Sequence, residues 1–284
     1  MQKILLFLII FPSLAFAGND DIRKSGFLKK QISTKVDKLE IIDPKNKIII
    51  IFNHGQESND SKKKNKCTWI SNVRNMASLI GERINGKEIM VYNFCTNHLE
   101  GDQMSEKYHL YHKKYVGPYK GKHKLEKRVD ANIKLIEQLI GMGVPKKQII
   151  ITGHSCGGLV TLMLFAKYPN AAGGGISFNQ ACFGKISKKE KAAKVGPEAA
   201  LDSFKKRRPG PSVVRQSQIE EIKNSKNLPL LAFTHPKDSY EGLLSDWLDE
   251  IPGLERIIIS EDYTINGQKC LLEFANGKER VKDG

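Results

Sequence analysis

Cysteine is scarce in this chain, and none of the cysteines is spaced to bind a metal. None of the five stands in a C-x-x-C pair, so the sequence offers no zinc-finger type of site, and we expect no metal and no cofactor. The odd number leaves at least one thiol free. Cys156 is the expected free thiol because it begins an apolar helix, and Cys67–Cys95 with Cys182–Cys270 is one pairing of several.

Long apolar runs are also rare, and the one that stands out lies at the N-terminus. Residues 1–17 hold Lys3, an apolar stretch, and Ala15 and Ala17 in the A-x-A arrangement that signal peptidase requires. We therefore expect a secretory signal that is cleaved after Ala17 and leaves a single domain over 18–284, exported to the periplasm or secreted. An uncleaved anchor is the alternative. No later segment is apolar enough to span a bilayer.

Arginine is the third shortage, although the chain is strongly basic. The formal net charge is +15, yet lysines outnumber arginines by 37 to 9 and are spread along the whole sequence. Specific recognition of phosphates and bases favours the forked guanidinium of arginine. The excess charge therefore indicates a solvated lysine surface, and no specific nucleic-acid partner is expected.

The apolar patterns predict a mainly parallel α/β domain. Short β-branched runs alternate with segments of helical periodicity, which is typical of a parallel sheet with helical crossovers. A basic segment at 185–227 is too long for an ordinary connection, and we interpret it as a helical, cap-like insertion over the site. The expected strands are 47–52, 88–94, 148–152, 174–179, 229–234 and 256–260, and the expected helices are 69–84, 129–140, the segment after 156 and 270–275.

The most informative motif is Gly153-His154-Ser155-Cys156-Gly157, which lies between an expected strand and an expected helix. This context distinguishes a nucleophile elbow from a chance G-x-S-x-G match. The turn is so tight that side chains at Gly153 and Gly157 would clash with their neighbours. It would raise the Ser155 hydroxyl above the sheet, at a helix N-terminus whose amides can bind an oxyanion.

Taken together, the strand pattern and this motif resemble the α/β-hydrolase superfamily over about residues 47–275. The resemblance implies that Ser155 is the nucleophile of an esterase-like enzyme with a small-molecule acyl substrate. It also implies an oxyanion hole formed by the backbone amides of Gln56, after the His54-Gly55 pair, and of Cys156. Asp238, which follows the expected strand at 229–234, is the implied catalytic acid, and a plain turn carboxylate is the alternative.

Histidine is missing where this superfamily has its catalytic base. All seven histidines precede Asp238, and the expected loop at 261–268 reads EDYTINGQ. A triad can be built with any chain order, so another histidine at the same rim of the sheet can serve. His235, at the end of the strand at 229–234, is the first candidate among the histidines and His98 the second; that no efficient base exists is the main alternative.

Two functional classes follow from these observations. The first is an exported serine hydrolase that cleaves an ester, thioester or amide, with Ser155 as nucleophile, Asp238 as acid and His235 as base. The second is a catalytically impaired hydrolase fold that acts as a binding module. The intact Ser155 motif favours the enzyme, and the absence of histidine from 261–268 favours the binding module.

Overall fold

The structure is a computed structural model of the 284-residue chain. It describes residues 25–29, 40–55, 76–95, 124–186, 189–260, 262, 264–265 and 268–269. The expected signal segment 1–17, Gln56, His98 and the expected helix 270–275 lie outside these residues. In the part that is described, no helix has the length and apolarity needed to cross a membrane.

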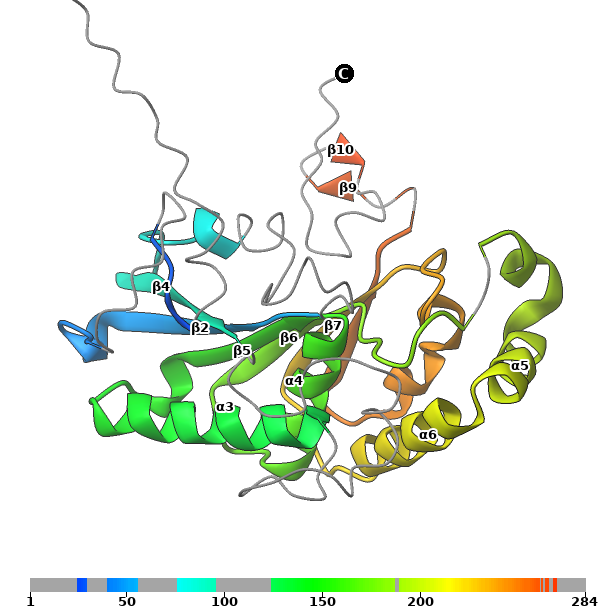
Figure 1. The fold of residues 1–284 in the computed structure, drawn as a ribbon. Coiled ribbons are helices and arrows are strands. Elements are labelled where there is room, and N and C mark those ends of the chain that lie inside the picture. Colours follow the sequence, from blue (N-terminus) through cyan, green and yellow to red (C-terminus); the bar gives the residue numbers. More distant parts are fainter. Residues whose placement is uncertain are drawn as a thin grey trace, which may run out of the picture.

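The centre of the molecule is an eight-stranded, mainly parallel sheet, as the sequence predicts (Figure 1). The strand order along the sheet is β1-β4-β2-β5-β6-β7-β8, with β3 paired to β4. β1 and β3 run antiparallel to β4, and the other pairings are parallel. The strands are β1 Gly26–Phe27, β2 Lys47–Asn53, β3 Arg83–Ile84, β4 Lys87–Phe94, β5 Ile149–His154, β6 Gly174–Phe178, β7 Leu230–Thr234 and β8 Leu254–Ile258.

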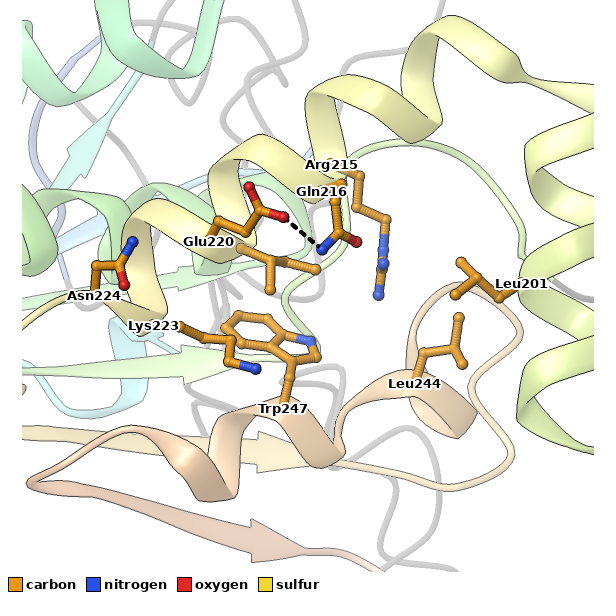
Figure 2. A pocket seen from close by; sticks show the side chains of 9 residues that line it. Leu201, Arg215, Gln216, Glu220, Lys223, Asn224, Leu244 and Trp247 are labelled. Carbon is orange, nitrogen blue, oxygen red and sulfur yellow. Dashed lines mark hydrogen bonds between the residues drawn. The ribbon is translucent and has the colours of Figure 1, made fainter.

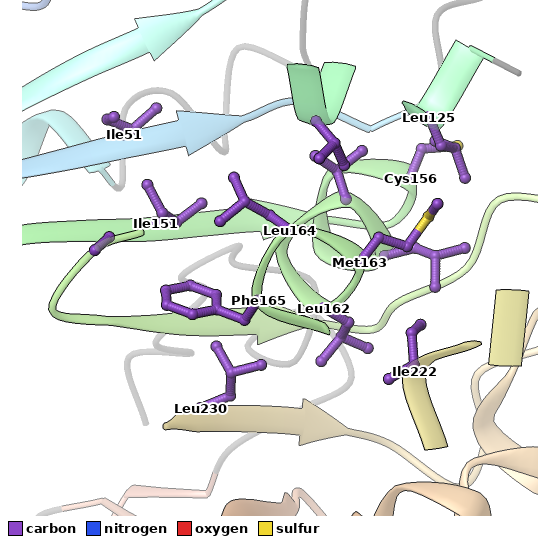
Figure 3. Close-up of a cluster of buried hydrophobic side chains, with 14 of the residues drawn as sticks. Ile51, Leu125, Ile151, Cys156, Leu162, Met163, Leu164, Phe165, Ile222 and Leu230 are labelled. Atoms are coloured by element: carbon purple, nitrogen blue, oxygen red, sulfur yellow. The ribbon is translucent and has the colours of Figure 1, made fainter. Parts of the chain in front are cut away.

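Hydrophobic cores lie on both faces of this sheet. The larger one contains Leu162 and Phe165 of α4 (Cys156–Lys167) together with the sheet residues Ile51 and Ile151 (Figure 3). The helix α3 (Lys124–Gly141) lies beside α4 on the same face (Figure 1). A separate, smaller cluster around Phe52 and Val91 lies on the opposite face, because Phe52 follows Ile51 in the same strand and points the other way. The nearly continuous apolar strands follow from burial on both faces.

The segment at 185–227 is helical, as predicted. It forms α5 (Lys189–Arg207), which is kinked at Gly196 where φ is 75°, and α6 (Pro209–Lys223). Phe204 and Ile222 from these helices are fully buried in the larger core. The segment therefore belongs to the helical layer of the domain through its apolar side chains.

Two local expectations need correction. The helix expected over 69–84 does not extend to its predicted end, because Arg83–Ile84 is strand β3, joined to β4 by a turn at Asn85 and Gly86 with φ of 51° and 76°. Asn-Gly is the preferred pair for such a two-residue hairpin turn, and it outweighs the helical periodicity. Within the expected loop 261–268, Thr264–Ile265 (β9) pairs antiparallel with Gln268–Lys269 (β10).

The parallel register brings distant segments to one edge of the sheet. Asn53 of β2 pairs with Gly153 of β5, and His154 at the end of β5 pairs with Phe178 of β6. Phe178 in turn pairs with Phe233 of β7. The segments that follow β2, β5, β6 and β7 therefore share the carboxyl rim of the sheet, where ligands bind in open α/β sheets.

Candidate active site

Ser155 occupies the sharp turn between β5 and α4. Its φ of 56° and ψ of −119° lie outside the regions that residues with side chains ordinarily adopt. Strain of this kind persists only where the surrounding structure enforces it, and it concentrates at functional sites. The helix begins at the next residue, Cys156, so that Ser155 stands at the positive end of the α4 dipole.

The backbone around Ser155 enforces the turn because two glycines allow chain segments to touch. A Cβ atom on Gly157 would overlap the carbonyl of Asn53, and one on Gly153 would overlap the backbone of Gly157. A Cβ atom on Gly55 would lie 3.2 Å from Cβ of Ser155. The turn and the end of β2 are thus packed backbone against backbone, which agrees with the geometry that the sequence motif predicts.

The loop after β2, where the resemblance puts part of the oxyanion hole, is braced by α3. Arg128 Nη1 donates to the carbonyl oxygen of His54 at 3.0 Å, and the amides of Asn132 and Asn53 donate to each other at 2.8 and 3.1 Å. All of these side chains are buried. The sequence interpretation missed Arg128 and Asn132, although two polar residues four apart among the apolar positions of α3 were a signal that could have identified them.

The Ser155 hydroxyl contacts the loop after β6. Its Oγ donates to the carbonyl oxygen of Ala181 at 2.8 Å, and the Ala181 N–H donates to the Ser155 carbonyl at 3.2 Å. Among the residues that the structure describes, the partners of this hydroxyl include no histidine. In this structure the Ser155 hydroxyl therefore donates its proton in a hydrogen bond to a backbone oxygen of the loop.

A disulfide joins Cys156 to Cys182 beside these contacts. The expectation that Cys156 is the free thiol is therefore wrong, and so is a Cys182–Cys270 pairing. Sequence gives no access to this pairing, because the sheet register is what brings the loop after β6 to the first residue of α4, with the two Cα atoms 4.4 Å apart. Cys95 is also disulfide-bonded.

Asp238 lies in the turn after β7, at the rim where the sequence places it. Its Oδ2 accepts from the Glu241 N–H at 3.2 Å. Burial raises the pKa of the Asp238 carboxyl, against the lowering effects of backbone N–H donors at Glu241 and Tyr240 and of the Lys185 charge. The carboxyl thus favours its protonated form more than a solvated aspartate does.

The turn that carries Asp238 is anchored by a buried ion pair. Arg215 of α6 donates from Nε and Nη2 to the two carboxylate oxygens of Glu241, at 2.8 and 2.7 Å. Both side chains are almost fully buried. Burial raises the pKa of Glu241, while the charge and hydrogen bonds of Arg215 lower it. This pair, which the sequence interpretation missed, ties the segment 238–241 to α6.

His235 is buried in the same turn. Its Nδ1 lies 3.1 Å from the backbone nitrogen of Lys237, and a ring nitrogen that accepts this hydrogen bond carries no proton. A neutral ring then has its proton on Nε2. A triad base needs the opposite tautomer, with Nδ1–H directed to the acid and Nε2 open to the serine. Within the described residues, the ring is hydrogen-bonded neither to Ser155 Oγ nor to the Asp238 carboxylate.

His54 shows the contrasting arrangement. Its Nδ1 lies 2.7 Å from the Gly55 carbonyl oxygen, which accepts only, so Nδ1 carries the proton. The side chain is buried, and its backbone carbonyl accepts from Arg128. His154 precedes Ser155 at the end of β5 and is partly exposed. In the described part of the chain, no group of three His, Cys, Asp or Glu side chains is arranged to hold a metal ion.

Comparison with protein families identifies one match. Residues 95–201, which include the Ser155 turn and the disulfide, match the phospholipase/carboxylesterase family model. A search among curated proteins finds no match.

Solved structures to which this chain is similar include several hydrolases of distant sequence. A phospholipase/carboxylesterase from Dyadobacter fermentans is 14% identical with a TM-score of 0.40, covering 78% of this chain and 85% of its own. An esterase from Rhizomucor miehei is 13% identical with a TM-score of 0.47, covering 91% and 78%. The acylaminoacyl peptidase of Pyrococcus horikoshii is 17% identical with a TM-score of 0.44, and this chain spans 36% of its length.

Proposed function

We propose that this chain, an α/β-hydrolase fold with an esterase-like family segment, hydrolyses an ester-type bond of a small-molecule acyl substrate through an acyl-enzyme on Ser155. The observation that carries the proposal is the strained backbone of Ser155 at the first turn of α4, at φ 56° and ψ −119°. Such a conformation costs on the order of 1–3 kcal/mol and is found mainly at functional sites. In a strand–turn–helix arrangement of this kind it exposes the nucleophile.

The chemistry has two halves. Ser155 Oγ attacks the acyl carbon while its proton passes to a base, the ester C–O bond breaks, and the alcohol leaves with that proton. Water then attacks the acyl carbon and gives a proton to the base, the bond from that carbon to Ser155 Oγ breaks, and the proton passes from the base to Oγ as the carboxylic acid leaves. The Cys156 N–H, at the positive end of α4, is positioned by sequence order to donate to the tetrahedral oxyanion, with the Gln56 N–H as the second proposed donor.

The base is the demanding part of the mechanism. We retain His235 as the first candidate, oriented by Asp238, because both follow β7 at the carboxyl rim. For His235 to accept the serine proton at Nε2, the ring proton must first move from Nε2 to Nδ1. Nδ1 must then give up the hydrogen bond that it accepts from the Lys237 N–H. The Ser155 hydroxyl must also turn away from the Ala181 carbonyl. Substrate entry has to supply both changes.

Export is part of the same proposal. The N-terminal segment 1–17 has the pattern of a secretory signal. The Cys156–Cys182 disulfide supports an oxidising compartment, because disulfides persist outside the cytosol and are rare within it. N-terminal sequencing of protein recovered from the periplasm or medium should begin at Gly18; a retained Met1 on membrane-bound protein would contradict cleavage.

A second function is favoured by a specific observation. The Ser155 hydroxyl donates to a backbone carbonyl, and no histidine follows Asp238 in the sequence. A serine without a base is a weak nucleophile at neutral pH. A hydrolase fold that binds an acyl compound without cleaving it is therefore the alternative.

Covalent labelling by a fluorophosphonate separates the two functions. The full chain should label on Ser155, as mass spectrometry of the labelled peptide can show, and Ser155→Ala should not label. Failure of the folded parent protein to label, with its thermal unfolding intact, would contradict the enzyme and support the binding module.

The same reagent tests the base. If His235 is the base, His235→Ala should reduce labelling about as strongly as Ser155→Ala, because the two groups act as a unit. His98→Ala is the matched control and should label like the parent. Normal labelling of His235→Ala together with loss in His98→Ala would transfer the role to His98.

A further inference from the structure

A cavity of about 380 Å³ lies between α5, α6 and the 3-10 segments η6 (Gly242–Leu244) and η7 (Asp246–Glu250) (Figure 2). Its size falls within the range of small-molecule sites. It is separate from the Ser155 turn, because its lining includes no residue of that turn or of the loop after β2. The lining includes Leu201, Arg215, Ile219, Glu220, Leu244 and Trp247.

Trp247 lines this cavity and carries a buried, unsatisfied donor, which a ligand oxygen reaches when the ring turns towards the cavity. Its indole Nε1 is buried, and among the described residues no acceptor lies within hydrogen-bond reach. A buried tryptophan N–H ordinarily finds a hydrogen-bond partner, since an unpaired buried donor destabilises the fold. Figure 2 shows the ring lying across the cavity, with its nitrogen on the side of Arg215 and Leu244. An acceptor brought by a ligand would satisfy it.

Arg215 adds a second donor group at the same place. Its Nε and Nη2 are committed to Glu241, and no partner for Nη1 is found in the described part of the chain. The guanidinium extends into the cavity beside Trp247 (Figure 2). Two N–H donors that line the same cavity are suited to one oxygen acceptor of the carbonyl type.

The charges around the cavity favour an uncharged ligand. Glu241 neutralises Arg215, and Lys223 forms an ion pair with Glu250, so neither cation is left to bind an anion. Glu220, whose carboxylate accepts from Gln216, adds a negative charge to the wall. A carboxylate ligand would therefore meet net repulsion, whereas an amide or ester carbonyl would not.

The remaining walls are apolar. Leu201, Ile219 and Leu244 line the cavity together with the Trp247 ring, so that a hydrocarbon group can replace water there. We infer that this cavity is a binding site for a small uncharged carbonyl compound with a hydrocarbon body, its oxygen accepting from Trp247 Nε1 and Arg215 Nη1. The site lies apart from the Ser155 turn, and its only link to the proposed reaction is Arg215, which also anchors the Asp238 turn through Glu241.

Indole NMR can test the site directly, because the chain has two tryptophans. In Trp69→Phe protein the single indole N–H signal reports Trp247. Hexanamide is the probe, and hexanoate is its charged counterpart of the same chain length. As hexanamide is added, this signal should shift downfield until the shift saturates. Hexanoate should bind at least about tenfold more weakly, a ratio that corresponds to roughly 1.4 kcal/mol.

Matched variants localise the binding. Leu201→Phe narrows the cavity and should raise the dissociation constant of hexanamide at least about tenfold. Val213→Phe introduces the same ring on an exposed position of α6 and should leave binding unchanged. If Trp69→Phe fails to fold, the two indole signals of the parent are assigned by Trp247→Phe. An unmoved Trp247 signal, equal binding by Leu201→Phe, or tighter binding of hexanoate would each overturn the inference.

Discussion

The turn around Ser155 and the turn around Asp238 lie at the same rim of the sheet, but they are built by different means. The Ser155 turn is formed by backbone against backbone, where Gly157 touches the end of β2. The Asp238 turn is held by side chains, through the Arg215–Glu241 pair, and by the hydrogen bond from the Glu241 N–H. The Ser155 turn depends on the absence of side chains at its glycines, whereas the Asp238 turn depends on the charges of Arg215 and Glu241, which lie 26 residues apart.

This difference explains why the two halves of the site were not equally visible in the sequence. Glycines that permit close approach stand within two residues of Ser155 and form a readable motif. Arg215 acts on a partner 26 residues away, from a helix of its own. The comparison also suggests that the first half tolerates almost no substitution, whereas the second can be rebuilt with matched changes. Four predictions test this contrast.

The largest effect is expected for Gly157→Ala. The added Cβ would overlap the Asn53 carbonyl, and two backbone segments cannot move apart without disrupting β2 or α4. We expect a loss of more than about 4 kcal/mol in the free energy of unfolding, measured by denaturant titration. Gly141→Ala, at the end of α3 with no atom within 4 Å of the added Cβ, is the control and should stabilise by about 0.4–1 kcal/mol. A stable Gly157→Ala protein would refute the close approach.

Removal of the disulfide should have the next largest effect. Cys156 and Cys182 are 26 residues apart, and closing a loop of that length restricts the unfolded chain by about 3.5 kcal/mol. The double variant Cys156→Ala/Cys182→Ala should unfold at a correspondingly lower denaturant concentration. The parent protein in reducing agent is a second comparison, in which the disulfide of Cys95 is broken as well. Equal midpoints for the parent with and without reductant would contradict the stabilising role of the bond.

Arg215→Met should cost about 3 kcal/mol in the free energy of unfolding, because it leaves the Glu241 carboxylate buried without its cation. Protonation of Glu241, whose pKa burial already raises, limits the loss. The double variant Arg215→Met/Glu241→Leu should recover most of it. A double-mutant cycle measures this coupling. Equal stabilities of the single and double variants would show that the pair does not support the Asp238 turn.

The smallest effect concerns pH. Burial raises the folded-state pKa of Asp238 above the ordinary 3.8, so the folded protein keeps a proton there that the unfolded chain has already released. The free energy of unfolding should therefore fall as pH rises from 3.8 towards the raised pKa. Asp238→Asn lacks this contribution, and its stability should decline less over the same range. Parallel stability curves for parent and variant would contradict the raised pKa.

Much of the fold could be predicted from the sequence because its signals are local. The β-branched runs of β2 and β5 and the apolar periodicity of α3 each report burial within a few residues. The helix expected up to residue 84 shows where one local signal overrides another, since the Asn85-Gly86 pair turns the chain into a hairpin. The turn signal is present in the sequence, but it decides the structure because β4 supplies a partner strand.

The sequence by itself determined the strands, the glycine-framed Ser155 turn and the position of Asp238 after β7, since each depends on sterics or burial among neighbouring residues. Only the tertiary structure decided that Cys156 pairs with Cys182, that Arg128 braces the loop after β2 and that Arg215 holds Glu241. These contacts join segments that the sheet register and the packing of α3 and α6 bring together. A covalent bond, a hydrogen bond or an ion pair depends on separations of a few ångströms, and those distances exist only once the layers have packed.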